Sequence, residues 1–362
     1  MNETLIPFCT MSLSTEQIGS IPRPSELIAG VAAHAAGTLS SEDLTVLSDN
    51  ALRDTIERLE ATGSPVVTDG EQTKPSFATY PVGAQFDGEG IVLPFADGHT
   101  RQLPRLVSGP FRYNVHADEY LVAAQRIATV PVKQAVIAPS ALSLFYPADG
   151  VEGYPREEFI ADLIDGAEAD VRRSLDAGAH VVQLDFTEGR LAVKLDPSLG
   201  LLRSFVDLNN RLLERFSDAE RARIGVHTCP GGDQDSTHSA DVDYADLLPD
   251  LFRIQAGNVY VALASEADPR RVLEVIAREA RPDQKVFVGV TDPIDPRVET
   301  VEEVRDRVLL AAEFIAPDRL GTCDDCGFSP FADDASTSRE IAFAKITSRV
   351  EGTRLASERL GV

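Results

Sequence analysis

The segment Ala222-Arg223-Ile224-Gly225-Val226-His227-Thr228-Cys229-Pro230-Gly231-Gly232 decides the fold, because it joins an apolar strand directly to a polar loop. Residues 224–227 read as a short buried strand, and Pro-Gly-Gly then turns the chain. Strand residues two apart share a face, so His227 and Cys229 point to one place beyond the strand's end. Imidazole and thiolate are preferred zinc ligands. The segment therefore predicts a strand whose carboxyl end carries half of a metal site.

The second half of this predicted zinc (Zn²⁺) site is Cys323-Asp324-Asp325-Cys326-Gly327, which follows the strand-like Leu320-Gly321. Either half alone is also explained by cysteines that serve as small buried residues. The four cysteines of the 362-residue chain are too few for a disulfide framework, which favours a reduced protein. A catalytic zinc takes three protein ligands and leaves a fourth position open.

Short apolar runs alternate with amphipathic helical stretches along the chain, and no low-complexity linker divides it. The runs are Val66-Val67, Lys133-Ile137, His180-Leu184, Ile224-His227, Val259-Leu263, Val286-Val290 and Leu320-Gly321. Seven or eight such units close most naturally as a TIM barrel of the α/β class. We expect one domain over residues 1–362, with an N-terminal extension and an inserted hairpin between Gly83 and Asn114.

In a barrel, catalytic groups belong at the carboxyl ends of the strands. The unusual polar residues lie there, since Asp69-Gly70-Glu71 follows Val66-Val67 and Asp185 ends another run. The spacing predicts that these acids line one pocket with the metal site. The alternative is that they only cap the helices that follow them.

The net charge of −24 argues against nucleic-acid and lipid-surface partners, because both require basic patches. A small anionic substrate needs only one or two arginines, such as Arg23. No secretory signal and no apolar run of about 20 residues is present, so we expect a cytoplasmic protein. The sequence does not decide the oligomeric state, and a homo-oligomer is one of the open alternatives.

Five motifs occur in a familiar order: Ile18-Gly19-Ser20-Ile21-Pro22-Arg23-Pro24, Asp69-Gly70-Glu71, Gln183-Leu184-Asp185, His227-Thr228-Cys229 and Asp325-Cys326-Gly327. The chain resembles cobalamin-independent methionine synthase over nearly its whole length. It matches the catalytic C-terminal barrel of that family, within a superfamily that also contains decarboxylase-like barrels. The N-terminal barrel of the full-length enzyme has no counterpart in this sequence.

The resemblance implies a methyltransferase of methionine biosynthesis in which zinc binds homocysteine as a thiolate. His227, Cys229 and Cys326 match the zinc ligands of the family. Ile18, Gly19 and Ser20 match the loop that holds the amino acid's carboxylate, while Glu71 and Asp185 match the pair that holds its ammonium group. His238 is the candidate for a histidine that assists proton movement, with Asp185 as the other catalytic candidate. The methyl donor is left open between a methylated folate, a methylated corrinoid protein and another methyl compound.

One position departs from the family. Its methionine synthases carry a glutamate ligand in the strand after the His-x-Cys element, where this chain has Leu263. Glu266 and Cys323 are the two candidates for a fourth ligand. We favour an open site with three ligands, because it leaves room for a substrate sulfur.

Two other functions compete with this reading. Epoxyalkane:coenzyme M transferases in the same superfamily use a His-x-Cys and a distant Cys without the glutamate. Coenzyme M has a sulfonate and no amine, so it would leave Glu71 and Asp185 without a cation. The other competitor is a zinc-stabilised binding or decarboxylase-like barrel, which would show a closed metal site.

Overall fold

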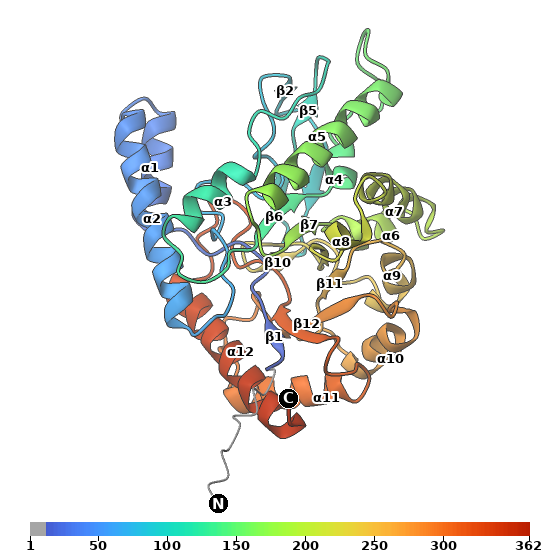
Figure 1. Cartoon of the computed structure of the whole chain (residues 1–362). Helices are drawn as coiled ribbons and strands as arrows, with labels where there is room; N and C mark the ends of the chain where they lie inside the picture. Colours follow the sequence, from blue (N-terminus) through green and yellow to red (C-terminus); the bar gives the residue numbers. More distant parts are fainter. Residues whose placement is uncertain (1–11) are drawn as a thin grey trace, which may run out of the picture.

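The computed structural model describes residues 12–362, in which a parallel sheet is surrounded by helices (Figure 1). The strands of this sheet are β1 (Ser14–Thr15), β6 (Gln134–Ile137), β7 (Val182–Asp185), β8 (Ile224–Thr228), β11 (Asn258–Val261), β12 (Lys285–Thr291) and β13 (Leu320–Asp324). The longer helices are α1 (Ser25–Ala35), α2 (Ser41–Ala61), α5 (Arg156–Asp176), α7 (Gly200–Leu213), α10 (Pro269–Glu279), α11 (Val301–Ala312) and α12 (Arg339–Leu360). The shorter ones are α3 (Asp118–Gln125), α4 (Pro139–Ser143), α6 (Gly189–Leu195), α8 (Asp218–Arg221) and α9 (Tyr244–Leu251).

The strand order of the sheet is β1-β13-β12-β11-β8-β7-β6, and all of these pairs are parallel. Val67 adds an eighth parallel segment through a bridge to Val132, beside β6. This segment and the loop after it reach the loop that follows β1 through two hydrogen bonds, from the Ile21 amide to the Gly70 carbonyl at 3.0 Å and from Thr68 Oγ1 to the Gly19 carbonyl at 2.9 Å. The prediction of a TIM barrel is confirmed.

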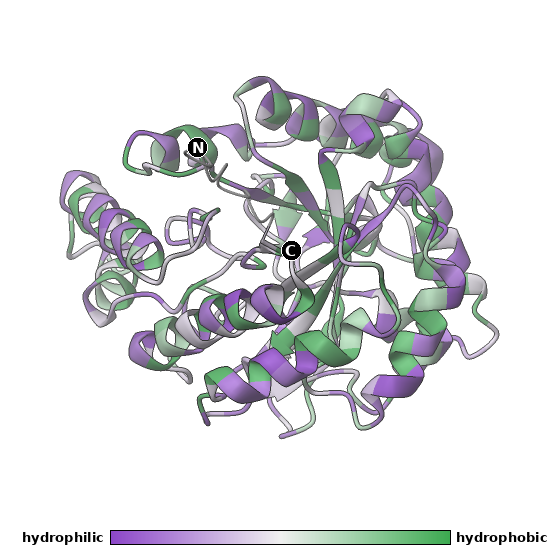
Figure 2. Cartoon of the chain, turned by 60° about the horizontal axis from the view of Figure 1, so that its bottom comes forward, coloured by the Kyte–Doolittle hydropathy of each residue, from purple (hydrophilic) through white to green (hydrophobic). Residues whose placement is uncertain are grey.

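Apolar and polar residues alternate along the helices, which Figure 2 shows as green and purple segments of the ribbons. The buried helix residues are mostly apolar, as with Leu163 in α5 and Ile276 in α10. A capping box begins α11, because the Thr300 hydroxyl accepts from the Glu303 amide while the Glu303 carboxylate accepts from the Thr300 amide. Behind it, Val304, Val308 and Ala311 are buried. None of the helices in residues 12–362 combines the length and apolar character needed to cross a bilayer.

The predicted insertion is a nested hairpin. Its outer pair is β2 (Phe86–Asp87) with β5 (Arg105–Leu106), and its inner pair is β3 (Val92–Pro94) with β4 (Thr100–Gln102). Both pairs are antiparallel, unlike the barrel strands. The expected N-terminal extension lies largely in residues 1–11, outside the described residues, as does Cys9; the chain is already in the sheet at β1.

The tip of the hairpin is fixed to the loop that follows β8. Arg101 forms ion pairs with Asp233 and Asp333, and His99 hydrogen-bonds to Asp233 at 3.1 Å. The Ala96 amide donates to the Thr237 carbonyl, which belongs to the small β9 (Gly232–Asp233) and β10 (Ser236–Thr237) ribbon. The insertion therefore covers the end of the barrel at which β8 finishes.

Candidate metal centre and substrate pocket

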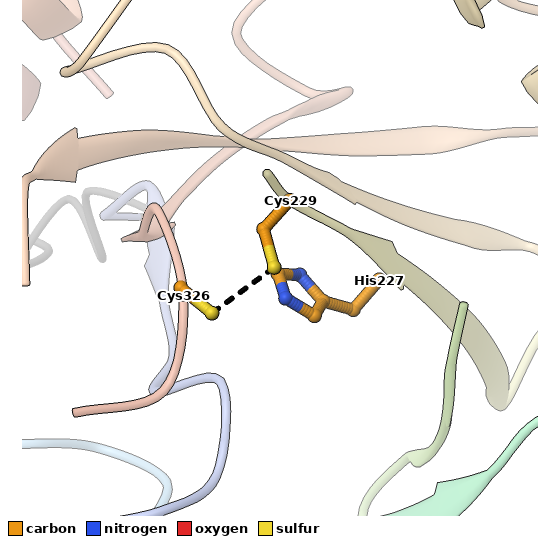
Figure 3. Close-up of side chains that lie close together, drawn as sticks. All are labelled: His227, Cys229 and Cys326. Carbon is orange, nitrogen blue, oxygen red and sulfur yellow. Dashed lines mark hydrogen bonds between the residues drawn. The ribbon is translucent and has the colours of Figure 1, made fainter. Parts of the chain in front are cut away.

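Three predicted ligands meet at the carboxyl end of the sheet. Single ligand atoms of His227, Cys229 and Cys326 all lie within 4.8 Å of one another, and the two sulfurs are 3.0 Å apart (Figure 3). His227 and Cys229 come from the end of β8, while Cys326 comes from the loop after β13. Within the described chain, the structure brings no other His, Cys, Asp or Glu into this cluster.

The three side chains suit a soft divalent metal. All are buried, and neither ring nitrogen of His227 has a hydrogen-bond partner among the described residues. A buried imidazole with both nitrogens unpaired is costly unless a ligand satisfies it. One imidazole and two thiols are a donor set that zinc prefers. The residues present therefore fit a metal ion.

One pocket collects the predicted substrate residues beside this cluster. Its lining includes His227 and Cys326 together with Ile18, Gly19, Ser20, Glu71, Asp185 and His238. Asp185 pairs with His227 across the neighbouring strands β7 and β8, which sets the acid beside this candidate metal ligand. Residues up to about 300 positions apart in sequence thus converge because parallel strands end at one face of the barrel.

The acids of the pocket are buried and differ in their partners. Glu71 adopts a φ of 55°, an uncommon conformation for a residue other than glycine, and such strain is concentrated at functional sites. Its Oε1 lies 3.5 Å from Lys74 Nζ, while Oε2 has no partner among the described residues. Asp185 Oδ1 accepts a hydrogen bond from Gln183 at 2.7 Å. Burial raises the pKa of both acids, that of Glu71 to about 7.

Lys74 was not predicted as part of the site. Its ammonium group is buried, donates to the Ala135 carbonyl at 2.9 Å and lies 5.0 Å from the centre of the Tyr80 ring. Burial lowers the pKa of Lys74, but the charges of Glu71, Asp69 and Asp185 together outweigh this effect and raise the pKa to about 12. The i,i+3 spacing of Glu71 and Lys74 was the only sequence signal for this pair. Glu71 therefore has a cation of its own, and part of the reasoning against coenzyme M no longer applies to it.

The loop of residues 18–20 presents main-chain groups to the pocket. The Ile18 and Gly19 carbonyls are engaged by Gln183 and Thr68, but no described residue accepts from the amides of Gly19 and Ser20. Gly327 packs on Ser20 so closely that a Cβ at position 327 would lie 2.3 Å from Ser20 Oγ. This contact holds the loop against the segment that carries Cys326.

Arg23, expected to receive an anionic group, is buried and does not line the pocket. Its guanidinium donates to four main-chain carbonyls, those of Glu71, Lys74, Ser329 and Phe331. These bonds tie the loop after the Val67 segment to the loop after β13. The structure thus gives Arg23 a positioning role in place of the expected contact with substrate.

The two candidate fourth ligands lie apart from the cluster. Glu266 forms an ion pair with Arg190 at 2.6 Å and lines a second pocket that also touches Cys326. Cys323 is fully buried in a small apolar cluster with Ile18 and Phe287. Neither joins the three ligand atoms in the described structure. The cluster in the described residues therefore consists of three side chains.

Asp325, beside the ligand Cys326, was not predicted to have a role. Its carboxylate accepts from the amides of Leu263, Ala264 and Ser265 at 2.7 to 2.9 Å, and from the Ser265 hydroxyl. The chain after β11 is thereby fixed to the loop that carries the metal ligand. The side chain of Leu263 itself is apolar and buried, so it contributes no ligand.

His238 lines the pocket as expected for a residue close to the chemistry. Its Nδ1 hydrogen-bonds to Ser239 Oγ at 2.6 Å, and its ring packs on Gly231, where a Cβ would lie 1.8 Å from Nε2. Burial, together with Lys194 and Arg190, lowers the pKa of His238 to about 4. The imidazole is therefore neutral at physiological pH.

Comparisons with known proteins agree with this geometry. A family model described as the catalytic domain of cobalamin-independent synthase matches residues 13–340. Proteins named methionine synthase from Sulfurisphaera tokodaii and Saccharolobus solfataricus are 24% and 25% identical to the chain. The first alignment covers 96% of this chain and 94% of the relative, and the second covers 96% of each.

Solved structures show the same fold. A B12-independent methionine synthase from Shewanella sp. W3-18-1 superposes with a TM-score of 0.75 at 20% identity, over 96% of this chain and 99% of that one. A putative enzyme of the same description from Listeria monocytogenes gives 0.69 at 19% identity, over 93% and 96%. Because the family model spans most of the sequence, the chain belongs to the cobalamin-independent synthase family and is a methyltransferase of its catalytic-domain type.

Proposed function

We propose that the chain is a zinc-dependent transferase that methylates a thiol, with homocysteine as the acceptor. One observation carries the proposal: the cluster of His227, Cys229 and Cys326 opens into the same pocket as Glu71, Asp185 and the loop of residues 18–20. A metal that activates sulfur and groups that recognise an amino acid are thus within reach of one small molecule.

Zinc held by His227, Cys229 and Cys326 would lower the pKa of a substrate thiol, which is about 8.5 when free, so that the thiolate forms at neutral pH. The chain's own groups would bind the rest of the molecule. The unpaired oxygen of Glu71 and the carboxylate of Asp185 suit an ammonium group. The free amides of Gly19 and Ser20 suit a carboxylate. Neutral His238 would assist the movement of the thiol's proton from the pocket to the solvent.

The acceptor's charge argues against the epoxide-opening alternative. A sulfonate such as that of coenzyme M calls for Lys or Arg in the pocket wall, and none of the described lining residues is of either type. The wall has three carboxyl groups instead, from Glu71, Asp185 and Glu188. The closed-site alternative required Cys323 in the cluster, and this residue lies elsewhere. For the donor, the family resemblance leaves methyltetrahydrofolate, a methylcorrinoid protein or another methyl compound.

The proposal is tested by calorimetric titration of zinc-loaded and zinc-free protein with homocysteine and, separately, coenzyme M. We expect homocysteine to bind only with zinc and to release a proton, and we expect Asp185→Asn to weaken it at least 10-fold. Glu214→Gln, which removes a charge from the surface, is the matched control and should bind normally. Binding of coenzyme M alone, insensitive to Asp185→Asn, would overturn the proposal.

A further inference from the structure

Glu188 is a buried acid that no step of the proposed transfer uses. It lies three residues after Asp185, at the N-cap of α6, and its side chain lines the pocket. The residue is 4% exposed, and neither carboxylate oxygen has a hydrogen-bond partner among the described residues. The Ser140 hydroxyl donates to Asn209 instead. A buried carboxyl group without a partner is costly, and a ligand that satisfies it would offset the cost.

The wall that Glu188 shares is mostly apolar and includes four phenylalanines. Phe77, Phe95, Phe145 and Phe331 line the same pocket, with leucines from the hairpin and from α6 between them. Aromatic rings attract cations, and desolvated aromatic sites recognise methylated ammonium groups. A carboxylate in an apolar pocket that also has phenyl rings is therefore a suitable environment for a compact, poorly hydrated cation.

Anionic donors find little attraction in the same region. The described lining contains no lysine or arginine, and the basic side chains around the mouth already have acidic partners. Arg101 is paired with Asp233, and Arg190 is paired with Glu266. The net charge of −24 adds a long-range repulsion for polyanions. A methyl donor with a glutamate tail would meet unfavourable electrostatics here.

We propose that the methyl donor is a small onium cation, a sulfonium or quaternary ammonium compound, bound with Glu188 as its counter-ion and the phenylalanines as its walls. This inference rests on the proposed thiol transfer. In the step, the bond between the acceptor's sulfur and the methyl carbon forms, while the bond between that carbon and the donor's sulfur or nitrogen breaks. The electron pair stays on the leaving atom, which becomes a neutral thioether or tertiary amine. The thiolate's negative charge and the donor's positive charge cancel, and the leaving group needs no proton.

Burial raises the pKa of Glu188 to about 8, so the empty pocket holds this group largely protonated at neutral pH. An onium ion favours the ionised form. Its binding at pH 7 should therefore release a proton, and the release should disappear above pH 9. A neutral ligand would cause no such release.

The test is calorimetric titration of zinc-loaded protein, with and without homocysteine, using trimethylsulfonium chloride, tetramethylammonium chloride and the neutral analogue tert-butanol. We expect both cations to bind at least 10-fold more tightly than tert-butanol. Glu188→Gln should lose this preference while homocysteine affinity is unchanged, and Glu214→Gln should behave as wild type. Transfer of labelled methyl from the sulfonium to homocysteine, but not from the ammonium, would identify the sulfonium as the donor class.

Equal affinity for the cations and tert-butanol, or an unchanged preference in Glu188→Gln, would overturn the inference. Methyl transfer from methyltetrahydrofolate with no binding of either cation would do so as well. The two proposals fail separately. If homocysteine binds in a zinc-dependent manner but the cations do not, only the onium donor is refuted, whereas loss of zinc-dependent thiol binding refutes the transfer itself.

Discussion

Replacement of Lys74 by methionine should strongly destabilise the protein. The ammonium group lies 3.5 Å from Glu71 Oε1, and the two side chains are 1% and 2% exposed. At that separation, an effective dielectric constant of about 20 gives an attraction of about 5 kcal/mol. Breaking a buried pair by removal of one partner typically costs about 3–5 kcal/mol, because the other charge stays buried. We therefore expect Lys74→Met to lower the free energy of unfolding by about 3–5 kcal/mol.

Urea unfolding followed by circular dichroism measures this loss, and a double-mutant cycle isolates the pair. Glu71→Gln in the Lys74→Met background removes the stranded acid, so the double variant should be more stable than Lys74→Met by at least about 2 kcal/mol. Arg53→Met is the control, because its ion pair with Glu57 is exposed on both sides and should be worth less than about 1 kcal/mol. Additive effects of the two pocket substitutions would refute the assignment of Lys74 as the counter-ion of Glu71.

Three further predictions concern other buried acids. The pKa of Glu188 is raised, so folding favours the protonated form of this acid, and its ionised form destabilises the fold increasingly between about pH 4.5 and pH 8. In thermal unfolding, Glu188→Gln should therefore be as stable as wild type at pH 4.5 and more stable by up to about 5 kcal/mol at pH 8.5. Glu16 is the opposite case, because burial raises its pKa but Lys133 and hydrogen bonds lower the pKa to about 2. Above pH 4.5 the ionised Glu16 contributes about 3 kcal/mol to the free energy of unfolding, and this contribution is lost as the pH falls towards 2. Glu16→Gln should remove that pH dependence. Asp325→Asn should lower zinc affinity about 10- to 100-fold in a chelator competition, because the asparagine side chain cannot accept hydrogen bonds from the Leu263, Ala264 and Ser265 amides as the carboxylate does. Unchanged zinc affinity would contradict this role.

The barrel was predictable because its strands are short apolar runs that end in polar residues. The runs at 133–137, 180–184, 224–227, 259–263, 286–290 and 320–321 all overlap observed strands. β1 was missed, since Ser14 and Thr15 are too few and too polar to show a period. Val67 forms only a single bridge, so its place in the barrel depends on hydrogen bonds between loops.

The metal cluster was predictable from ligand chemistry and strand alternation, and the pocket acids from their place at strand ends. The positions of Lys74 and Glu188 were not predictable, because both residues lie in loops. The course of the backbone in a loop leaves no periodic pattern in the sequence. The covering hairpin was expected, but its attachment was not. Arg101 and Asp233 are separated by 132 positions, and only the folded chain shows that they meet.

Zinc content measured together with homocysteine binding tests the central claim most directly, in wild type and in Cys326→Ser. The three-ligand site predicts one zinc per wild-type chain and homocysteine binding that requires it, with proton release. Cys326→Ser should lose both the metal and the thiol while Asp185→Asn keeps the metal and binds homocysteine weakly. A zinc-loaded wild-type protein that binds no thiol, or a zinc-free one that binds homocysteine equally well, would contradict the account.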